Sequence, residues 1–349
     1  MKTNKTNLKS RIFAVMVSVM LLATCFMSTT AFAEDGSPVV DEKVTFEKNL
    51  VMDKEAHVPQ ATFNFSIAAA EGNTQSQLPT ITPSVSFSDA DTADATTGTP
   101  TNPNDATKKY ATKTVEVNFT NVEWTAPGIY SYTITETGTV QGVTNDVNST
   151  RTLDVRVVYD KDGKLHVDQS GLHTYNNKSN GFTNTYDTHN LTLSKTVAGN
   201  QGDRGYYFDF SVTLTAPANT VFDVTLPAED NDSANVNKIT VPTEGTITVN
   251  YKLKNGQSIV INGITDDATY TITETAVEGY TTVNSKNGDN GNTTGIITIN
   301  NDDSVTFTNT KNGTVPTGIL LETAPYMILG AVVLAGIVVL FVTRRRRSH

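Results

Sequence analysis

The chain has 349 residues, of which 37% are apolar and 18% are charged, so it is long enough for two ordinary domains and is not a disordered chain. Its formal net charge of -10 excludes nucleic acid as a partner, because a nucleic-acid surface needs a clustered basic face. A strongly acidic chain of this kind is expected to be highly soluble.

The first 33 residues have the features of a secretory signal peptide. Four basic residues precede an apolar run, and Ala31 and Ala33 are the small residues that a signal peptidase reads. We therefore expect cleavage between Ala33 and Glu34. A lipoprotein signal ending at Cys25 is the alternative, but Thr24 is a poor match for the small residue that such a signal needs before its cysteine.

Cleavage after Ala33 would remove Cys25, the only cysteine of the chain. The exported protein could then form no disulfide, thiol nucleophile or thiolate metal site. Any covalent cross-link in the mature protein must therefore use other chemistry.

Short alternating runs rich in Thr, Val, Asn and Gly follow the signal peptide, without convincing helical periodicity. Apolar side chains alternate with polar ones over residues 44–46, 115–119, 153–159 and 297–299, so each run places its apolar side chains on one face. Turn dipeptides such as Asp162-Gly163 separate the runs. The sequence predicts an all-β protein.

One segment, residues 87–109, is poor in apolar residues and dense in Asp, Thr, Asn and Pro. This composition predicts a mobile surface insertion within the first domain. Asp89, Asp91 and Asp94 lack the Gly and the terminal Glu of a calcium-binding loop, so we expect a solvated loop without metal.

Several polar residues occur in phase with the apolar face of a predicted strand. Lys48 shares its face with Val44, Phe46 and Leu50, so its side chain is expected to point into the core. The same argument turns five further polar side chains inward: Glu136, Asn184, Lys195, Glu274 and Asn309. Each half of the chain therefore buries one Lys, one Glu and one Asn, in that order.

Two interpretations of these triads are open. The lysine and glutamate could form a buried ion pair that the asparagine helps to satisfy, although desolvation of two charges can exceed their attraction. Alternatively, burial makes the amine and the carboxyl neutral, and the amine attacks the side-chain carbonyl of the asparagine with loss of ammonia. The carboxylic acid would polarise that carbonyl and move protons. Occurrence of the triad in both halves favours the second interpretation.

The two halves also repeat short sequences. Tyr-Thr-Ile-Thr-Glu-Thr occurs at residues 132–137 and 270–275, and Phe-Thr-Asn-Thr occurs at residues 182–185 and 307–310. Because the copies keep the same order, we predict two copies of one domain in tandem. The predicted domains span residues 34–187 and 188–313.

The C-terminal region combines a short motif, an apolar segment and a basic tail. Val315, Pro316, Thr317 and Gly318 precede the apolar residues 326–342, and four arginines follow. A single-pass anchor is one explanation, since the apolar segment is just long enough to span a bilayer. The order of the three features, however, resembles the sorting signal that sortases cleave between Thr and Gly in Gram-positive bacteria. The predicted sorting signal spans residues 314–349, and the membrane would hold it only transiently.

The ordered triads and this motif together resemble the isopeptide-linkage domains of streptococcal-type major pilins, over nearly all of residues 44–318. The resemblance implies two immunoglobulin-like β-sandwiches stacked end to end. It also implies two intramolecular amide bonds and their catalytic acids: Lys48 to Asn184 with Glu136, and Lys195 to Asn309 with Glu274.

A shaft pilin also needs an amine that receives the Thr317 carbonyl of another subunit. The family places this lysine shortly before the last strand of the first domain, where Lys178 lies six residues before Asn184. Lys161 and Lys164 are the alternatives.

The function implied is that of a structural pilus subunit on the cell wall of a Gram-positive bacterium, with no enzymatic activity beyond autocatalytic cross-linking. Its expected partners are a pilin sortase, further copies of itself, minor pilins and peptidoglycan, and no cofactor is expected. A wall-anchored adhesin that is not polymerised is the alternative. A surface hydrolase is disfavoured, because the histidines after the signal peptide lie singly in polar contexts and no HExxH or GxSxG motif occurs.

Overall fold

The structure is a computed structural model that describes residues 37–39, 42–93, 105, 107–175, 177–228, 232–287 and 291–313. The predicted signal peptide, the centre of the predicted insertion and the predicted sorting signal lie outside these residues. No helix within the described ranges is long and apolar enough to cross a membrane.

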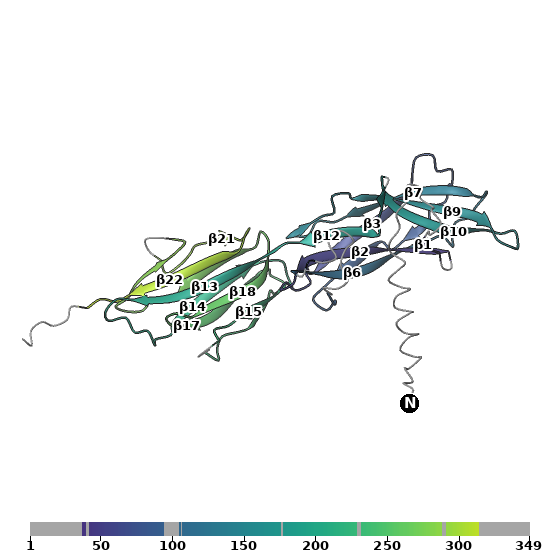
Figure 1. Ribbon diagram of the computed structural model, residues 1–349. Coiled ribbons are helices and arrows are strands. Elements are labelled where there is room, and N and C mark those ends of the chain that lie inside the picture. The colour runs from purple at the N-terminus through teal and green to yellow at the C-terminus, as the bar shows by residue number, and fades with distance from the viewer. Residues whose placement is uncertain are drawn as a thin grey trace, which may run out of the picture.

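The described chain is built from β-strands that form two sandwiches end to end (Figure 1). This confirms the predicted all-β class with immunoglobulin-like sandwiches. Each sandwich has its own core of buried apolar side chains. The first core is built from residues 44–186 and the second from residues 191–307, so each half of the chain folds around a core of its own.

The first sandwich packs a seven-stranded sheet against a five-stranded sheet. The seven-stranded sheet has the order β1-β10-β9-β7-β3-β5, with β11 beside β10: β1 (Ser37–Pro38), β10 (Leu165–Thr174), β9 (Thr150–Tyr159), β7 (Gly128–Thr137), β3 (Ala61–Ala69), β5 (Ser84–Phe87) and β11 (Asn177–Lys178). The five-stranded sheet has the order β4-β6-β2-β12-β8: β4 (Thr80–Ile81), β6 (Lys108–Asn118), β2 (Lys43–Asp53), β12 (Gly181–Tyr186) and β8 (Val143–Thr144).

The second sandwich packs a six-stranded sheet against a four-stranded sheet. The six-stranded sheet has the order β16-β15-β18-β13-β22-β20: β16 (Lys238–Thr240), β15 (Val221–Thr225), β18 (Ser258–Thr265), β13 (Thr188–Ala198), β22 (Asp303–Thr310) and β20 (Thr281–Asn284). The four-stranded sheet has the order β17-β14-β19-β21: β17 (Thr246–Leu253), β14 (Phe208–Thr215), β19 (Thr269–Glu274) and β21 (Ile297–Thr298).

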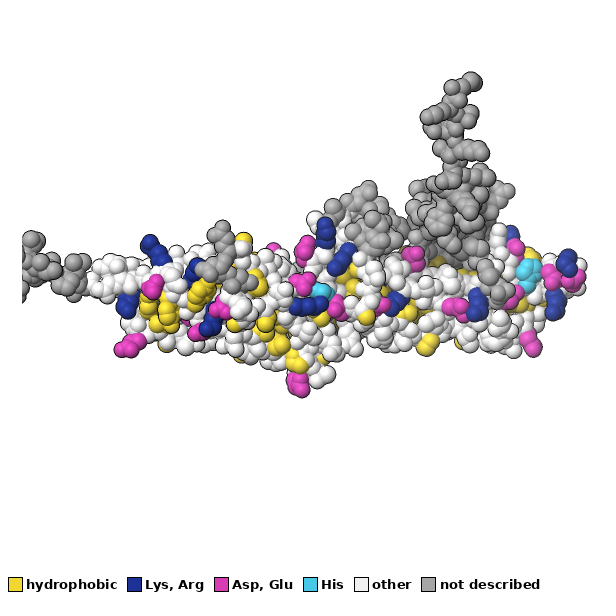
Figure 2. All heavy atoms as spheres, turned by 90° about the horizontal axis from the view of Figure 1, so that it is seen from below, with side chains coloured by type: hydrophobic (Ala, Val, Ile, Leu, Met, Phe, Trp, Pro, Cys, Tyr) yellow, Lys and Arg dark blue, Asp and Glu magenta, His cyan; other side chains and the backbone are white. Residues whose placement is uncertain are grey.

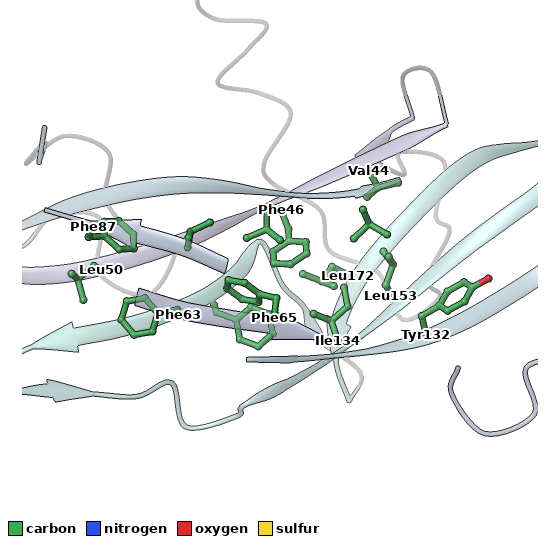
Figure 3. Packing of buried hydrophobic residues seen from close by; sticks show 14 of the residues in the cluster. Val44, Phe46, Leu50, Phe63, Phe65, Phe87, Tyr132, Ile134, Leu153 and Leu172 are labelled. Atoms are coloured by element: carbon green, nitrogen blue, oxygen red, sulfur yellow. The ribbon is translucent and has the colours of Figure 1, made fainter. Parts of the chain in front are cut away.

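Strand alternation places the aromatic side chains of both sheets in the first core (Figure 3). Phe46 of one sheet meets Phe65 of the other edge to face, with ring centroids 5.9 Å apart. Phe63 and Phe87 make a second edge-to-face contact at 6.0 Å. In β3 the intervening side chains of Thr62, Asn64 and Ser66 are exposed, as the period of two requires.

Both sandwiches place their first long strand beside their last strand, in parallel. β2 pairs with β12 in the first sandwich, and β13 pairs with β22 in the second. Gly181 begins β12 with φ +148°, and a Cβ at this position would lie 1.7 Å from the carbonyl oxygen of Glu47. Only glycine therefore allows β12 to begin so close to β2.

The two sandwiches meet without a linker, because β12 ends at Tyr186 and β13 begins at Thr188. The buried Tyr186 hydroxyl lies 2.6 Å from the hydroxyl of Thr265 in the second sandwich. The Thr188 hydroxyl donates a hydrogen bond of 2.8 Å to Asp53 in the first sandwich. These contacts tie the two sandwiches together at the point where the chain passes from one to the other.

The predicted insertion is shorter than the sequence indicated. Phe87 is buried as the last residue of β5, and β6 already begins at Lys108. At the start of the insertion, Asp91 forms an ion pair with Lys113, so this end is tied to the sheet.

Tyr159, expected on an apolar face, is 58% exposed because it lies at the last position of β9.

Exposed charges are spread along the molecule on the face that Figure 2 shows, where basic and acidic side chains alternate without a large area of one sign. Among the described residues, no cluster of three His, Cys, Asp or Glu side chains could hold a metal ion.

Candidate functional site

The first triad is assembled from three strands of two sheets. Lys48 comes from β2 and Asn184 from the parallel neighbour β12, where Lys48 lies opposite Phe182 and Asn184 lies opposite Leu50. The two side chains are therefore diagonal neighbours on the inward face of one sheet. Glu136 comes from β7 in the opposite sheet, so its side chain approaches from across the core.

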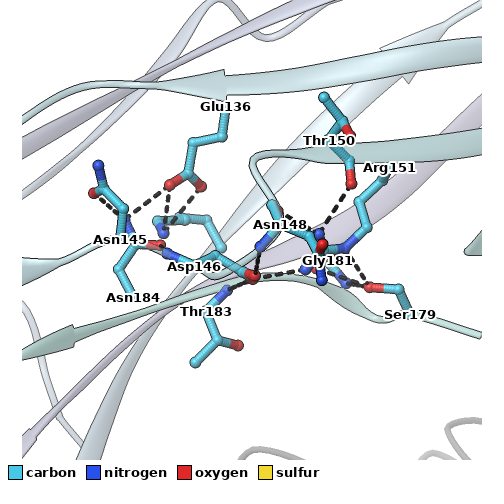
Figure 4. Close-up of polar contacts among 11 residues, drawn as sticks. Glu136, Asn145, Asp146, Asn148, Thr150, Arg151, Ser179, Gly181, Thr183 and Asn184 are labelled. Carbon is cyan, nitrogen blue, oxygen red and sulfur yellow. Dashed lines mark hydrogen bonds and ion pairs between the residues drawn. The ribbon is translucent and has the colours of Figure 1, made fainter. Parts of the chain in front are cut away.

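The carboxyl group of Glu136 lies between the amine and the carboxamide. Lys48 Nζ lies 3.2 Å from Oε1 and 3.0 Å from Oε2, and Asn184 Nδ2 donates to the same Oε1 at 2.8 Å (Figure 4). Lys48 and Asn184 are 0% exposed and Glu136 is 6% exposed. The strand-phase prediction that all three side chains point inward is confirmed.

The second triad repeats this arrangement. Lys195 of β13 lies opposite Phe307 of β22, and Asn309 lies opposite Val197, which is the same relative register as in the first sandwich. Lys195 Nζ donates to Glu274 Oε2 at 2.8 Å, and Asn309 Nδ2 donates to Glu274 Oε1. All three side chains of this triad are buried, again as strand phase predicts.

A phenylalanine ring covers each amine. Lys48 Nζ lies 4.1 Å from the ring centroid of Phe63, and Lys195 Nζ lies 4.1 Å from that of Phe208. Each of these phenylalanines begins a Phe-x-Phe sequence, residues 63–65 in β3 and residues 208–210 in β14. The rings exclude water from the amines, and this desolvation disfavours the charged form of lysine.

Burial changes the protonation of both sites. It lowers the pKa of Lys48 to about 8, and the attraction of Glu136 opposes only part of this effect. Burial likewise lowers the pKa of Lys195 and raises the pKa of Glu274. A neutral amine, which is the form that can act as a nucleophile, thus becomes more accessible at both sites, and at the second site burial also favours the protonated carboxyl of Glu274.

Three polar residues around Asn184 were not found from the sequence. Asn184 Nδ2 donates to Asn145 Oδ1 at 3.1 Å, and the backbone N–H of Asp146 donates to Asn184 Oδ1 at 3.0 Å, while Arg151 pairs with the Asp146 carboxylate (Figure 4). Asn145 and Asp146 lie in an irregular segment, where strand phase gives no direction for a side chain. The buried Arg151 shares its strand phase with Leu153, Val155 and Val157 of β9, so the same phase argument that found the triads predicts that it points inward.

The predicted polymerisation lysine lies in β11, where Lys178 pairs with His173 of β10. The alternatives Lys161 and Lys164 lie in the exposed turn between β9 and β10. Val315, Pro316, Thr317 and Gly318 lie outside the described residues, as do Ala33 and Glu34.

Of the predicted surface histidines, three lie beside carboxylates and none forms a nucleophilic arrangement. His57 lies between Asp89 and Asp223, and His173 and His189 each contact one aspartate: Asp154 and Asp266. His166 lies in β10 and is half-buried.

Each sandwich matches a known domain family, and the chain as a whole resembles a pilin. The Spy0128-like isopeptide containing domain family matches residues 44–187, and a domain family of unknown function, DUF7601, matches residues 189–311. A pilin of Streptococcus pyogenes serotype M1 is 30% identical over 338 residues, which cover 90% of this chain and 93% of that protein.

Two further relatives extend the comparison. The crystal structure of the major pilin from Streptococcus pyogenes superimposes with a TM-score of 0.57 and 25% identity, over 79% of this chain and 100% of that chain. The pilus tip adhesin Cpa of Streptococcus pyogenes is 35% identical over 136 residues, covering 39% of this chain and 18% of that protein. The near-complete match to the pilin shows that this chain belongs to the same pilin family, with a Spy0128-like isopeptide domain over residues 44–187.

Proposed function

We propose that this chain is the repeating structural subunit of a surface pilus, and that an intramolecular amide bond closes each sandwich. The observation that carries the proposal is the duplicated triad, in which a buried amine and a buried carboxamide contact the same carboxyl group. The proposed bonds join Lys48 to Asn184 and Lys195 to Asn309.

The local chemistry supports bond formation over a permanent ion pair. The amine and the carboxamide condense to an amide and ammonia, while Glu136 or Glu274 transfers the protons. The product is neutral, so the energetic cost of a buried charge disappears. The pKa of each lysine, lowered by burial, supplies the neutral amine that the reaction needs.

Polymerisation would join the C-terminal motif of one subunit to the first sandwich of another. In this proposal a signal peptidase cleaves after Ala33, and a pilin sortase cleaves after Thr317 and transfers its carbonyl to Lys178 of another subunit. The last subunit is transferred to peptidoglycan, which anchors the pilus in the cell wall. β22 ends at Thr310, at the end of the second sandwich remote from the first, which favours a head-to-tail fibre.

Expression in the parent cells tests this proposal. Extracts of wild-type cell walls should give a ladder of covalent multimers on a denaturing gel, and Thr317→Ala and Lys178→Ala should each reduce it to monomer. Lys161→Ala and Lys164→Ala are the matched controls and should leave the ladder intact. A ladder that survives Lys178→Ala would contradict the assigned nucleophile, and one that survives Thr317→Ala would contradict sortase polymerisation at this motif.

The similarity to a tip adhesin over 136 residues gives the alternative, a wall-anchored adhesin that is not polymerised. In that case wild-type walls would release a single band, and the isolated protein would bind a host protein.

A further inference from the structure

The two triads differ in what contacts the carbonyl oxygen of the asparagine. In the first sandwich, Asn184 Oδ1 accepts the hydrogen bond from the backbone N–H of Asp146, and Asn184 Nδ2 also donates to Asn145 Oδ1 at 3.1 Å. Both ends of this carboxamide are therefore fixed (Figure 4). In the second sandwich, Asn309 Oδ1 is buried without a hydrogen-bond donor among the described residues.

The path of the neighbouring edge strand explains the difference. β8 pairs with β12 only at Val143 and Thr144, after which the chain leaves the ladder and turns the Asp146 N–H toward the Asn184 side chain. The corresponding strand β20 stays paired with β22, and Thr282 lies opposite Asn309. The backbone of β20 therefore stays hydrogen-bonded to β22, and no N–H of this strand donates to Asn309 Oδ1.

An ion pair between the partly buried Asp146 and the buried Arg151 holds Asp146 in this position. The Asp146 carboxylate accepts from Arg151 at 2.6 Å, from the backbone N–H of Thr183 at 2.9 Å and from that of Asn148 at 3.0 Å. Thr183 is the residue immediately before Asn184, so this carboxylate ties the irregular segment to the strand that carries the carboxamide.

Arg151 is itself fixed by its surroundings. Its side chain is 93% buried, it donates from Nε to the carbonyl of Gly181 at 3.0 Å and to the hydroxyl of Ser179 at 2.8 Å, and its guanidinium lies 4.5 Å from the ring centroid of Phe182. If Asp146 moved away, the buried guanidinium of Arg151 would lose its carboxylate partner, which would cost free energy.

We propose that the backbone N–H of Asp146 stabilises the oxyanion formed during the first cross-link, and that Arg151 is the positioning residue that holds it there. This inference rests on the proposed amide bond between Lys48 and Asn184. The amine lone pair forms a bond to Asn184 Cγ, and the carbonyl π electrons move to Oδ1, where the Asp146 N–H donates to the developing charge. Glu136 gives its proton to Nδ2 and receives one from the amine nitrogen. The Cγ–Nδ2 bond then breaks, ammonia leaves and the carbonyl re-forms.

The test is a time course of both cross-links in one molecule. Cell-free synthesis of residues 34–317 is pulsed, quenched in denaturant and digested, and mass spectrometry measures the cross-linked fraction for each sandwich. Loss of an oxyanion donor typically slows a reaction by about 10²–10³-fold. Arg151→Met should therefore slow the first cross-link by at least about tenfold relative to the second, and Arg151→Lys should restore part of the rate because it keeps a cation beside Asp146.

Arg156→Met is the matched control, because Arg156 also lies on β9 but pairs with Asp168 at the surface. It should leave both rates unchanged. Folding is measured separately by the fluorescence of Trp124 in a Glu136→Ala background, with and without Arg151→Met, since neither protein can form the first cross-link.

A folded Arg151→Met protein that forms the first cross-link at the wild-type ratio would overturn the inference. If Arg151→Met does not fold, Asp146→Asn is measured in the same way, because it keeps the side-chain volume but offers one acceptor fewer, and an unchanged ratio would overturn the inference equally. Absence of ammonia loss in the wild-type protein would instead contradict the proposed amide bonds themselves.

Discussion

At the residue scale, the most unfavourable feature of each sandwich is the desolvation of a lysine amine that is buried in the core. Lys48 and Lys195 each lie beneath a phenylalanine ring and beside one carboxyl group, and burial lowers the pKa of both. A permanent ion pair would leave this cost in the folded protein, whereas amide formation removes it.

The pKa of Lys48 predicts a pH dependence for a protein that cannot form the first cross-link. In Asn184→Ala, the folded protein releases the Lys48 proton near pH 8, while the unfolded chain releases it near 10.5. The unfolded state therefore binds more protons between these values, and the free energy of unfolding should rise by about 2–3 kcal/mol from pH 8 to pH 10. Denaturant titration followed by Trp124 fluorescence measures the rise.

Lys48→Met in the same Asn184→Ala background is the control, because it removes the titrating amine and keeps an apolar side chain of similar length. The pH-dependent rise should disappear in this double variant. An equal rise in both proteins would show that another group is responsible.

The triads could be predicted from the sequence because strand phase alone decides whether a side chain points inward. Asp146 could not be predicted, since its role depends on a backbone N–H in an irregular segment. Its carboxylate is also oriented by Arg151 and Thr183, which lie on two other strands. Only the fold brings these groups to Asn184.

At the element scale, the proposed cross-link in each sandwich depends on the parallel pairing of the first long strand with the last strand, in the same register in both sandwiches. Lys48 and Asn184 occupy diagonal positions on β2 and β12, and Lys195 and Asn309 occupy the same positions on β13 and β22. The repeated sequences indicated that the two halves are alike. They did not indicate the parallel pairing, because alternation gives the inward face of a strand and not its neighbour.

Gly181 is the position where this pairing is most sensitive. Gly181→Ala would bring a Cβ within 1.7 Å of the Glu47 carbonyl oxygen, so β12 must move away from β2. In the Glu136→Ala background, we expect a loss of more than about 2 kcal/mol in the free energy of unfolding of the first sandwich. Trp124 fluorescence during denaturant titration measures this loss.

Gly163→Ala is the matched control, because Gly163 also has a positive φ but no atom lies within 4 Å of its added Cβ. It should cost only the strain of the left-handed conformation, about 1–2 kcal/mol. Equal losses in the two variants would contradict the close approach of β12 to β2 as the cause.

At the scale of the whole molecule, two sandwiches lie end to end and the chain passes directly from one to the other. An amide between the first and last strands of each sandwich would carry a pulling force past the rest of that sandwich. Each amide would also close a loop of more than about 100 residues, from Lys48 to Asn184 and from Lys195 to Asn309. By analogy with disulfides, this would lower the entropy of the unfolded chain and add on the order of 4–5 kcal/mol to the free energy of unfolding.

Single-molecule pulling from the two ends of the mature chain tests this mechanical role. The wild-type protein should show no extension from the residues enclosed by either cross-link. Glu136→Ala should add one unfolding event, which lengthens the molecule by about 450 Å. This is the contour length of the chain between Lys48 and Asn184, which the missing cross-link no longer encloses. A wild-type protein that extends by this length would contradict a closed first sandwich.

The two proposed amide bonds are tested most simply by the intact mass of the mature protein, residues 34–317, beside Glu136→Ala and Glu274→Ala. The wild-type mass should be lower than the sequence mass by two ammonia molecules, and each variant should regain one of them. A folded wild-type protein with the full sequence mass would mean that neither amide bond forms and that both triads are buried ion pairs.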